Sequence, residues 1–167
     1  SIAKRIERGQ SNVRKALSRS LIVIQELVRL GKEVERDRES IRKLLNFNHD
    51  ERAEERIAER RKEFLETCTQ VAQLYKRLNR LRRKRDATSP RKKPQDYHRL
   101  GRALARCRVH ISRKIRSIDF SHEEQNRLIE RIREVVTEMR GLERKASRLE
   151  QRIESSRRNY LLELKKE

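Results

Sequence analysis

Residues 64–118 decide the fold of this chain, and they read FLETCTQVAQLYKRLNRLRRKRDATSPRKKPQDYHRLGRALARCRVHISRKIRSI. Apolar residues recur in both halves at spacings of three and four, which is typical of one face of a helix. The first stripe is Phe64, Cys68, Val71, Tyr75 and Leu78, and the second is Tyr97, Leu100, Leu104, Cys107, Ile111, Ile115 and Ile118. Pro90 and Pro94 lie between the stripes, where they cannot continue a helix. The sequence therefore predicts a helical hairpin over residues 54–118 with its loop at residues 86–96.

A heptad stripe lies beyond the hairpin. Its members alternate between spacings of four and three: Leu128, Ile132, Val135, Met139, Leu142, Ala146, Leu149 and Ile153. Ser121 and Glu124 precede it with the spacing of a capping box, so we expect a long helix over residues 122–163. Successive patterned segments favour a folded-back helical bundle over one long dimeric coiled coil. The predicted core of the hairpin and this helix is Val71, Tyr75, Leu104, Ile111, Ile132, Val135 and Met139.

The first 48 residues contain shorter patterns. One amphipathic helix is predicted from Ile2, Ile6, Val13 and Leu17. Ser20 can cap an apolar helix over residues 21–30, which Gly31 can end. Ser40 can cap another short helix, and residues 46–50 read as a turn. We therefore divide the chain into residues 1–48, with short helices, and residues 49–167, a helical domain.

Composition agrees with an all-α fold. The chain has 167 residues, of which 43% are charged, 34% are hydrophobic and 4% are aromatic. The longest apolar run is residues 21–24, which is too short to cross a bilayer. Strand signals and a disulfide framework are both missing from the pattern. We expect a cytoplasmic protein without a membrane partner.

Catalysis finds little support in the sequence. It has no glycine-rich phosphate loop and no nucleophile elbow, so we expect no enzyme, no cofactor and no small-molecule substrate. Cys107 and His110 could offer two metal ligands from one helix face, but a zinc site needs about four. Folding the hairpin about Arg91 brings Cys107 level with Tyr75 and leaves Cys68 roughly 10 Å away along the axis, at about 1.5 Å per residue. Both cysteines are therefore predicted to be free thiols in the core.

Positive charge is concentrated at the predicted loop. Residues 76–102 hold 12 basic and 2 acidic residues. Their net charge of +10 is half of the chain's net charge of +20. We name the seven cations that flank the loop the basic tip: Arg82, Arg83, Lys84, Arg85, Arg91, Lys92 and Lys93. Such a cluster attracts nucleic acid or an acidic protein surface, although it can also serve without a specific partner. Few aromatic residues are available to stack on bases.

The segment IAKRIERGQ at residues 2–10 resembles the end of region 1.2 of bacterial primary sigma factors, the housekeeping specificity subunits of RNA polymerase. Residues 18–30 and SIRKLLNF at 40–47 are similar to the next segments of that family, and IRSIDF at 115–120 resembles a version found in some phyla. The resemblance is specific over residues 2–10 and looser beyond them. It implies that the chain is a piece of a larger protein, without the start of region 1.2 and without region 2.

The resemblance also implies a function in transcription initiation. The family's non-conserved region is a helical domain that contacts the β′ subunit of core RNA polymerase near the clamp. In some members it also contacts promoter DNA near the −10 element, and it affects open complexes and promoter escape. The candidate contact residues are the basic tip together with Lys4, Arg5 and Arg8. The alternative is a stand-alone basic coiled-coil protein with a structural or nucleic-acid-associated role.

Overall fold

The structure is a computed structural model that describes residues 2–37, 40–47 and 54–164. Six helices are present in these ranges: α1 (Ile2–Leu17), α2 (Leu21–Arg36), α3 (Ser40–Leu44), α4 (Glu54–Asp86), α5 (Pro94–Arg116) and α6 (His122–Leu164). The described residues form no strand beyond one isolated bridge between Leu45 and Phe120, which confirms the all-α class. The chain divides into two compact units, residues 1–129 and residues 130–167, and each is described by itself.

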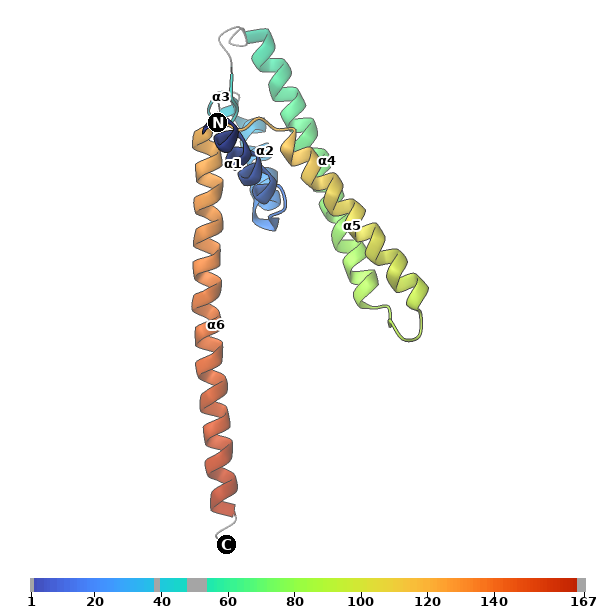
Figure 1. Cartoon of the computed structure of the whole chain (residues 1–167), viewed down its shortest axis with the longest axis vertical. Helices are drawn as coiled ribbons and strands as arrows, with labels where there is room; N and C mark the ends of the chain where they lie inside the picture. The colour runs from blue at the N-terminus through green and yellow to red at the C-terminus, as the bar shows by residue number, and fades with distance from the viewer. Residues whose placement is uncertain (1, 38–39, 48–53, 165–167) are drawn as a thin grey trace. The chain divides into compact units, whose positions relative to one another are not determined.

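The predicted hairpin is confirmed. Helices α4 and α5 lie side by side and antiparallel, joined by residues 87–93 (Figure 1). The Cys107 thiol donates a hydrogen bond to the carbonyl oxygen of Leu74 at 3.4 Å, one residue from the level predicted for Cys107. Loop position and antiparallel folding therefore suffice to determine the register of the hairpin.

Both apolar stripes of the hairpin supply its core. The first buries Phe64, Cys68, Val71 and Leu78, and the second buries Leu104, Cys107, Ile111, Ile115 and Ile118. The core predictions for Val71, Leu104 and Ile111 are thus confirmed, while Tyr75 is only half-buried. Neither cysteine is in a disulfide, and both are buried, as predicted.

Helix α2 packs on the hairpin through α4. It runs past Gly31 to Arg36, so the prediction that Gly31 ends the helix is wrong. Gly31 instead permits a close approach of the two helices, because a Cβ atom there would lie only 3.1 Å from Cβ of Cys68. The apolar face of α2 consists of Val23, Leu27, Leu30 and Val34. These side chains are buried, and none is more than 2% exposed.

The carboxyl end of α2 is also tied to α4. Arg61 donates to the carbonyl oxygen of Val34 from Nη2 at 2.8 Å and from Nε at 3.1 Å, and Nη2 also reaches the carbonyl oxygen of Glu35 at 3.3 Å. A cation at this position satisfies carbonyl groups that have no partner inside the helix. This contact therefore fixes the end of α2 on the hairpin.

The start of α6 is joined to the end of α3 in the same unit. The Ser121 amide donates to the carbonyl oxygen of Leu44 at 2.8 Å, and its hydroxyl donates to the carbonyl oxygen of Lys43 at 2.6 Å. The amide of Glu124 donates to Ser121 Oγ at 3.2 Å, which forms one half of the predicted capping box. The buried Glu124 carboxylate turns instead to Arg127, at 2.6 Å, so the second half does not form.

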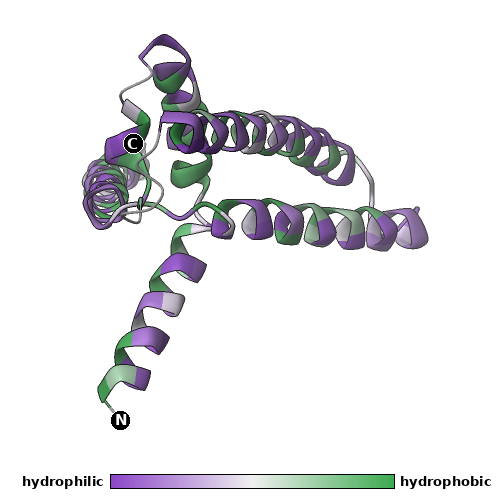
Figure 2. Ribbon diagram, turned by 90° about the horizontal axis from the view of Figure 1, so that it is seen from above, coloured by the Kyte–Doolittle hydropathy of each residue, from purple (hydrophilic) through white to green (hydrophobic). Residues whose placement is uncertain are grey.

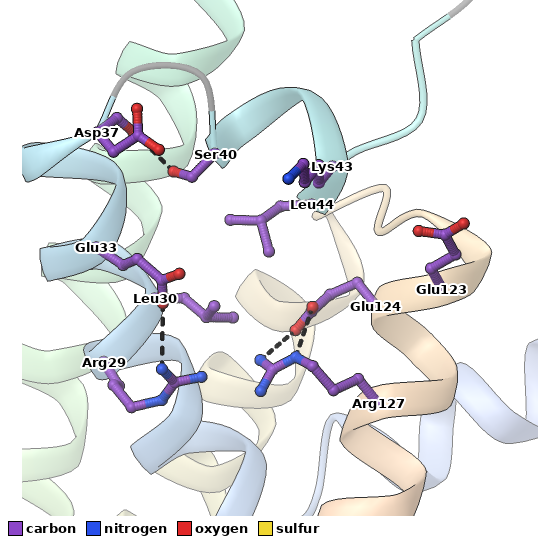
Figure 3. A pocket seen from close by; sticks show the side chains of 10 residues that line it. All are labelled: Arg29, Leu30, Glu33, Asp37, Ser40, Lys43, Leu44, Glu123, Glu124 and Arg127. Atoms are coloured by element: carbon purple, nitrogen blue, oxygen red, sulfur yellow. Dashed lines mark hydrogen bonds and ion pairs between the residues drawn. The ribbon is translucent and has the colours of Figure 1, made fainter.

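A pocket of about 410 Å³ lies between α2, α3 and this first part of α6 (Figure 3). Several of the charged side chains around it are paired with each other. Arg29 pairs with Glu33 at 3.1 Å, and Arg127 pairs with Glu124. The hydrogen bond to Glu124 is the main reason why the pKa of Arg127 is raised above its ordinary value. Because these charges are compensated, the pocket presents no concentrated field of either sign.

The prediction that Met139 is a core residue is not confirmed. Its side chain is 54% exposed, and Leu142, Leu149 and Ile153 are exposed as well, whereas Ile132 and Val135 are half-buried. Within the first unit, the element that packs on the hairpin is α2. A heptad pattern marks which face of a helix is apolar but does not determine its partner.

Helix α1 forms over the predicted residues, and hydrophobic residues recur along it between hydrophilic ones (Figure 2). Ile2 and Ile6 are exposed, and the one buried side chain of the helix is Leu17. Next to it, Ser18 Oγ lies 2.7 Å from Ser112 Oγ of α5, and both serines are buried. Ser18 donates its own proton to the carbonyl oxygen of Lys15 at 2.9 Å, so Ser112 is the donor to Ser18.

The remaining predictions for the first 48 residues have mixed outcomes. Ser20 occupies the N-cap of α2, but its side chain makes no capping hydrogen bond. Ser40 begins α3, where its hydroxyl donates to the carbonyl oxygen of Asp37 at 2.7 Å. The turn predicted at residues 46–50 lies largely outside the described residues.

The role of Gly31 is testable by placing the same side chain in two helices. We expect Gly31→Leu to destabilise the first unit by about 1–3 kcal/mol, because the helices must separate to admit it. Gly101→Leu is the matched control, since nothing lies within 4 Å of a Cβ at Gly101. There we expect a gain of about 0.5–1 kcal/mol from helix propensity. Urea unfolding followed by circular dichroism measures the free energy of unfolding of both variants. Similar effects at the two positions would contradict the close approach of α2 and α4 at Gly31.

The thiol of Cys68 gives a prediction on pH. Burial, aided by the negative charge of Glu35, raises its pKa to about 12 from an ordinary value of 9.0. The folded state therefore favours the protonated thiol, and this contribution to stability is present below pH 9 and falls as pH rises towards 12. We expect the wild type to lose more stability than Cys68→Ala over this interval in urea unfolding. Parallel pH profiles for the two proteins would contradict the shift.

Candidate nucleic-acid interface

The basic tip begins at the carboxyl end of α4. Backbone amides of the loop close this end: Ala87 donates to the carbonyl oxygen of Arg83 and Thr88 to that of Arg85, both at 3.0 Å. The Thr88 hydroxyl adds a hydrogen bond to the carbonyl oxygen of Lys84 at 2.7 Å. Carbonyl groups at a helix end carry partial negative charge, which neighbouring cations stabilise. The dense positive charge of this segment is therefore compatible with its helical structure.

The tip continues through the loop to the start of α5. The amide of Lys93 donates to the carbonyl oxygen of Ser89 at 3.0 Å, and Pro94 occupies the first turn of α5, where its fixed φ suits a helix start. Arg91, Lys92 and Lys93 are all exposed. The loop thus has a defined backbone that presents three cations to solvent.

Arg85 differs from the other six residues of the basic tip. It is half-buried, its guanidinium lies 5.5 Å from the centre of the Tyr97 ring, and it lies 3.8 Å from the carboxylate of Asp86. These contacts join the end of α4 to the start of α5. Arg85 therefore has a structural role within the hairpin, while the other six side chains are exposed.

Carboxylates compensate little of this charge. Asp86 reaches Arg82 at 3.9 Å, and Asp96 pairs with Arg99 at 3.0 Å, outside the basic tip. In the part of the chain that the structure describes, no ion pair involves Arg83, Lys84, Arg91, Lys92 or Lys93. A cluster of exposed cations without carboxylate partners attracts phosphate groups over several ångströms. The nearby Tyr97 ring faces Arg85 at 5.5 Å, so it is not free to stack on a base.

Lys4, Arg5 and Arg8 form a second exposed basic group, on α1. The contact between Ser18 and Ser112 joins α1 to α5, and Lys4 lies 14 residues from it, or about 21 Å along α1. The start of α5 lies about 27 Å from the same contact along the hairpin. Figure 2 shows α1 and the hairpin running in different directions. The structure therefore does not bring the two predicted basic groups into one patch.

A third basic feature was not predicted from the sequence. A groove beside α5 is lined by Arg19, Arg108, Arg113 and Arg116 together with exposed apolar side chains. In the sequence, Val109 is the one hint of this groove, because it is apolar but lies off the stripe that forms the core of the hairpin.

Cys107 and His110, the two side chains weighed above as possible metal ligands, differ in their environment. The thiol of Cys107 is buried and donates to Leu74, whereas His110 is exposed. Across the described ranges, no three His, Cys, Asp or Glu side chains come together as a metal site would require. None of the helices described here combines the length and apolar character needed to cross a bilayer. Comparison with known proteins finds no match to a family model, to a curated protein or to a solved structure.

The role of the basic tip is testable by charge reversal. We expect the triple variant Arg91→Glu, Lys92→Glu, Lys93→Glu to unfold within about 0.5 kcal/mol of the wild type, because all three side chains are exposed. Carboxylates just before the amino end of α5 are also favourable to the helix dipole. Affinity for duplex DNA should fall, and the slope of log affinity against log salt should decrease by about 0.9 for each phosphate that the variant no longer neutralises.

The matched control is Arg140→Glu, Arg144→Glu, Arg148→Glu, which makes the same change in net charge at exposed positions of α6. Binding by fluorescence anisotropy and thermal melting are compared for the three proteins. An equal loss of DNA binding in both variants would mean that net charge, and not the basic tip, is responsible. A large fall in melting temperature for the tip variant would mean that the tip is structural.

Proposed function

We propose that this chain is a piece of a bacterial primary sigma factor that spans the end of region 1.2 and the non-conserved region before region 2. It acts in transcription initiation, where it binds core RNA polymerase on the β′ clamp side and contacts promoter DNA near the −10 element. The observation that carries the proposal is the segment IAKRIERGQ at residues 2–10. The all-helical fold is compatible with the helical domain that the resemblance implies.

The exposure of α1 supports a contact role for that segment. Ile2 and Ile6 are exposed together with Lys4, Arg5 and Arg8, so both apolar and cationic groups are available to a partner. A surface of this composition suits a protein partner, because burial of the apolar groups supplies affinity and the cations supply orientation. We therefore assign α1 as a candidate contact for the polymerase in addition to the helical domain, and the basic tip as a candidate contact for DNA.

The basic tip supports contact with DNA that does not depend on base sequence. Its exposed cations can pair with phosphates, whereas the nearby Tyr97 ring is already engaged by Arg85. Phosphate contacts would hold DNA near the polymerase and would have to be released when the polymerase leaves the promoter. Open-complex lifetime and promoter escape are thus the steps that the tip is expected to modulate.

Two experiments test the proposal. The first is the gene sequence that flanks the segment, where a region 2 pattern directly after Glu167 supports the proposal and a stop codon there refutes it. The second is binding of the purified chain to core RNA polymerase and to isolated β′. We expect binding to both proteins, and we expect the tip reversal in full-length sigma to retain polymerase assembly while it alters open-complex lifetime or escape. No binding to either polymerase preparation would contradict the proposed partner.

A second candidate is a stand-alone basic coiled-coil protein with a structural or nucleic-acid-associated role. The exposed heptad residues of the second unit favour it: Met139, Leu142, Leu149 and Ile153. Such a stripe can pair with the same stripe of a second copy. Sedimentation equilibrium separates the candidates, because a dimer that Leu142→Ser dissociates supports this one, and a monomer at all concentrations excludes it.

A further inference from the structure

A groove of about 680 Å³ lies in the first unit, between the hairpin and the junction of α1 and α2. Its floor includes the buried side chains of Ile24, Leu78 and Ile111. Leu21 and Val109 also line it, and each is 47% exposed. The volume lies within the range of about 300–1,000 Å³ that is typical of ligand sites. The groove thus offers apolar surface that the chain itself leaves open.

Five arginines surround this apolar floor: Arg19, Arg82, Arg108, Arg113 and Arg116. All five are exposed, and no carboxylate is among the side chains that line the groove. Within the described residues, Arg19, Arg108 and Arg113 make no ion pair. The charge of the rim is therefore almost entirely uncompensated.

The contrast with the other face of α2 is informative. There, Arg29 and Arg127 both contact the carboxylate of Glu26, at 3.0 and 3.5 Å. The chain therefore pairs arginines with carboxylates where helices meet, but not around the groove. Five cations of one sign around an apolar floor repel one another, and an anionic partner would relieve that repulsion.

We propose that the groove binds an acidic amphipathic helix of a partner protein. Apolar side chains at helical spacing would occupy the floor and cover Leu21 and Val109, which is the usual way in which a helix binds a groove. Carboxylates on the flanks of that helix would accept charge-assisted hydrogen bonds from the arginine rim, where the planar guanidinium permits two parallel bonds. The groove would bind such a helix whether or not the chain takes part in transcription.

A protein partner fits the groove better than nucleic acid does. Phosphates could pair with the arginines, but they gain nothing from the aliphatic groups of Leu21 and Val109. Binding of single strands relies on aromatic platforms, and the one aromatic residue in the lining is Tyr75, which is half-buried. The apolar floor therefore decides between the two classes of partner.

The test uses synthetic fluorescent peptides and the whole chain. The first peptide contains leucine and glutamate, with leucine at positions i, i+3, i+4 and i+7 so that one helical face is apolar. The second has the same composition in scrambled order, which keeps the charge and removes the apolar face. We expect the first to bind at least about tenfold more tightly, the factor that corresponds to one buried aliphatic side chain. Methyl NMR signals of Leu21, Val109 and Ile111 should shift with the first peptide.

Variants locate the site. Val109→Ser should weaken binding of the amphipathic peptide about fivefold to tenfold, whereas the control Val136→Ser, at a partly exposed valine of α6, should not. Arg108→Glu with Arg113→Glu should weaken it more than tenfold, compared with the matched reversals Arg140→Glu and Arg144→Glu. Because every substituted side chain lies at the surface, melting temperatures should stay close to the wild type, and this is measured for each protein.

Three results would overturn the proposal. Equal affinity for the amphipathic and scrambled peptides would mean that only charge is recognised. Equal losses in the groove variants and their controls would place the peptide elsewhere on the chain. If Val109→Ser and the Arg108→Glu, Arg113→Glu pair instead reduce binding of duplex DNA and leave peptide binding intact, the groove belongs to a nucleic-acid interface.

Discussion

The packing of α2 on the α4–α5 hairpin is the contact on which the first unit depends, because it buries Val23, Leu27, Leu30 and Val34 in a chain that is only 34% hydrophobic. At its centre the two helices approach closely at Gly31 and Cys68, and Arg61 fixes the end of α2 on α4. Burial of this surface must offset both the conformational entropy of the chain and the mutual repulsion of its excess cations. The same contact forms one wall of the arginine-rimmed groove.

The distribution of ion pairs separates structural charges from available ones. Around α2, α3 and the start of α6, arginines are paired with carboxylates and contribute to helix packing, as with Glu26 and Arg127. At the basic tip and around the groove, the cations have almost no carboxylate partners. These two surfaces share Arg82 but differ in chemistry, since the tip is cationic, whereas the groove has an apolar floor. They therefore suit different partners, phosphates for the tip and an acidic helix for the groove.

Two apolar faces lie outside the contacts described here. Ile2 and Ile6 on α1, and Leu142 on α6, are exposed although each belongs to a regular helical stripe. Helical stripes of this kind are stabilised when another helix covers them. The primary sigma factor proposal gives α1 a partner in RNA polymerase, and the coiled-coil candidate gives α6 a partner in a second copy of the chain.

The sequence alone determined the local features of this protein: the helical class, the two helices of the hairpin, its loop at the prolines and its register to within one residue at Cys107. Periodicity and proline chemistry act over a few residues, so they can be read from the chain itself. Only the tertiary structure decided that α2 packs on the hairpin and that Gly31 permits a close approach of the two helices. It also decided that Arg85 lies against Tyr97. Finally, it decided that arginines from the α1–α2 junction, α4 and α5 line one groove. These features join residues far apart in the chain, and a stripe or a cation carries no local signal of the surface it will meet, because that choice depends on the shapes and charges of all the elements together.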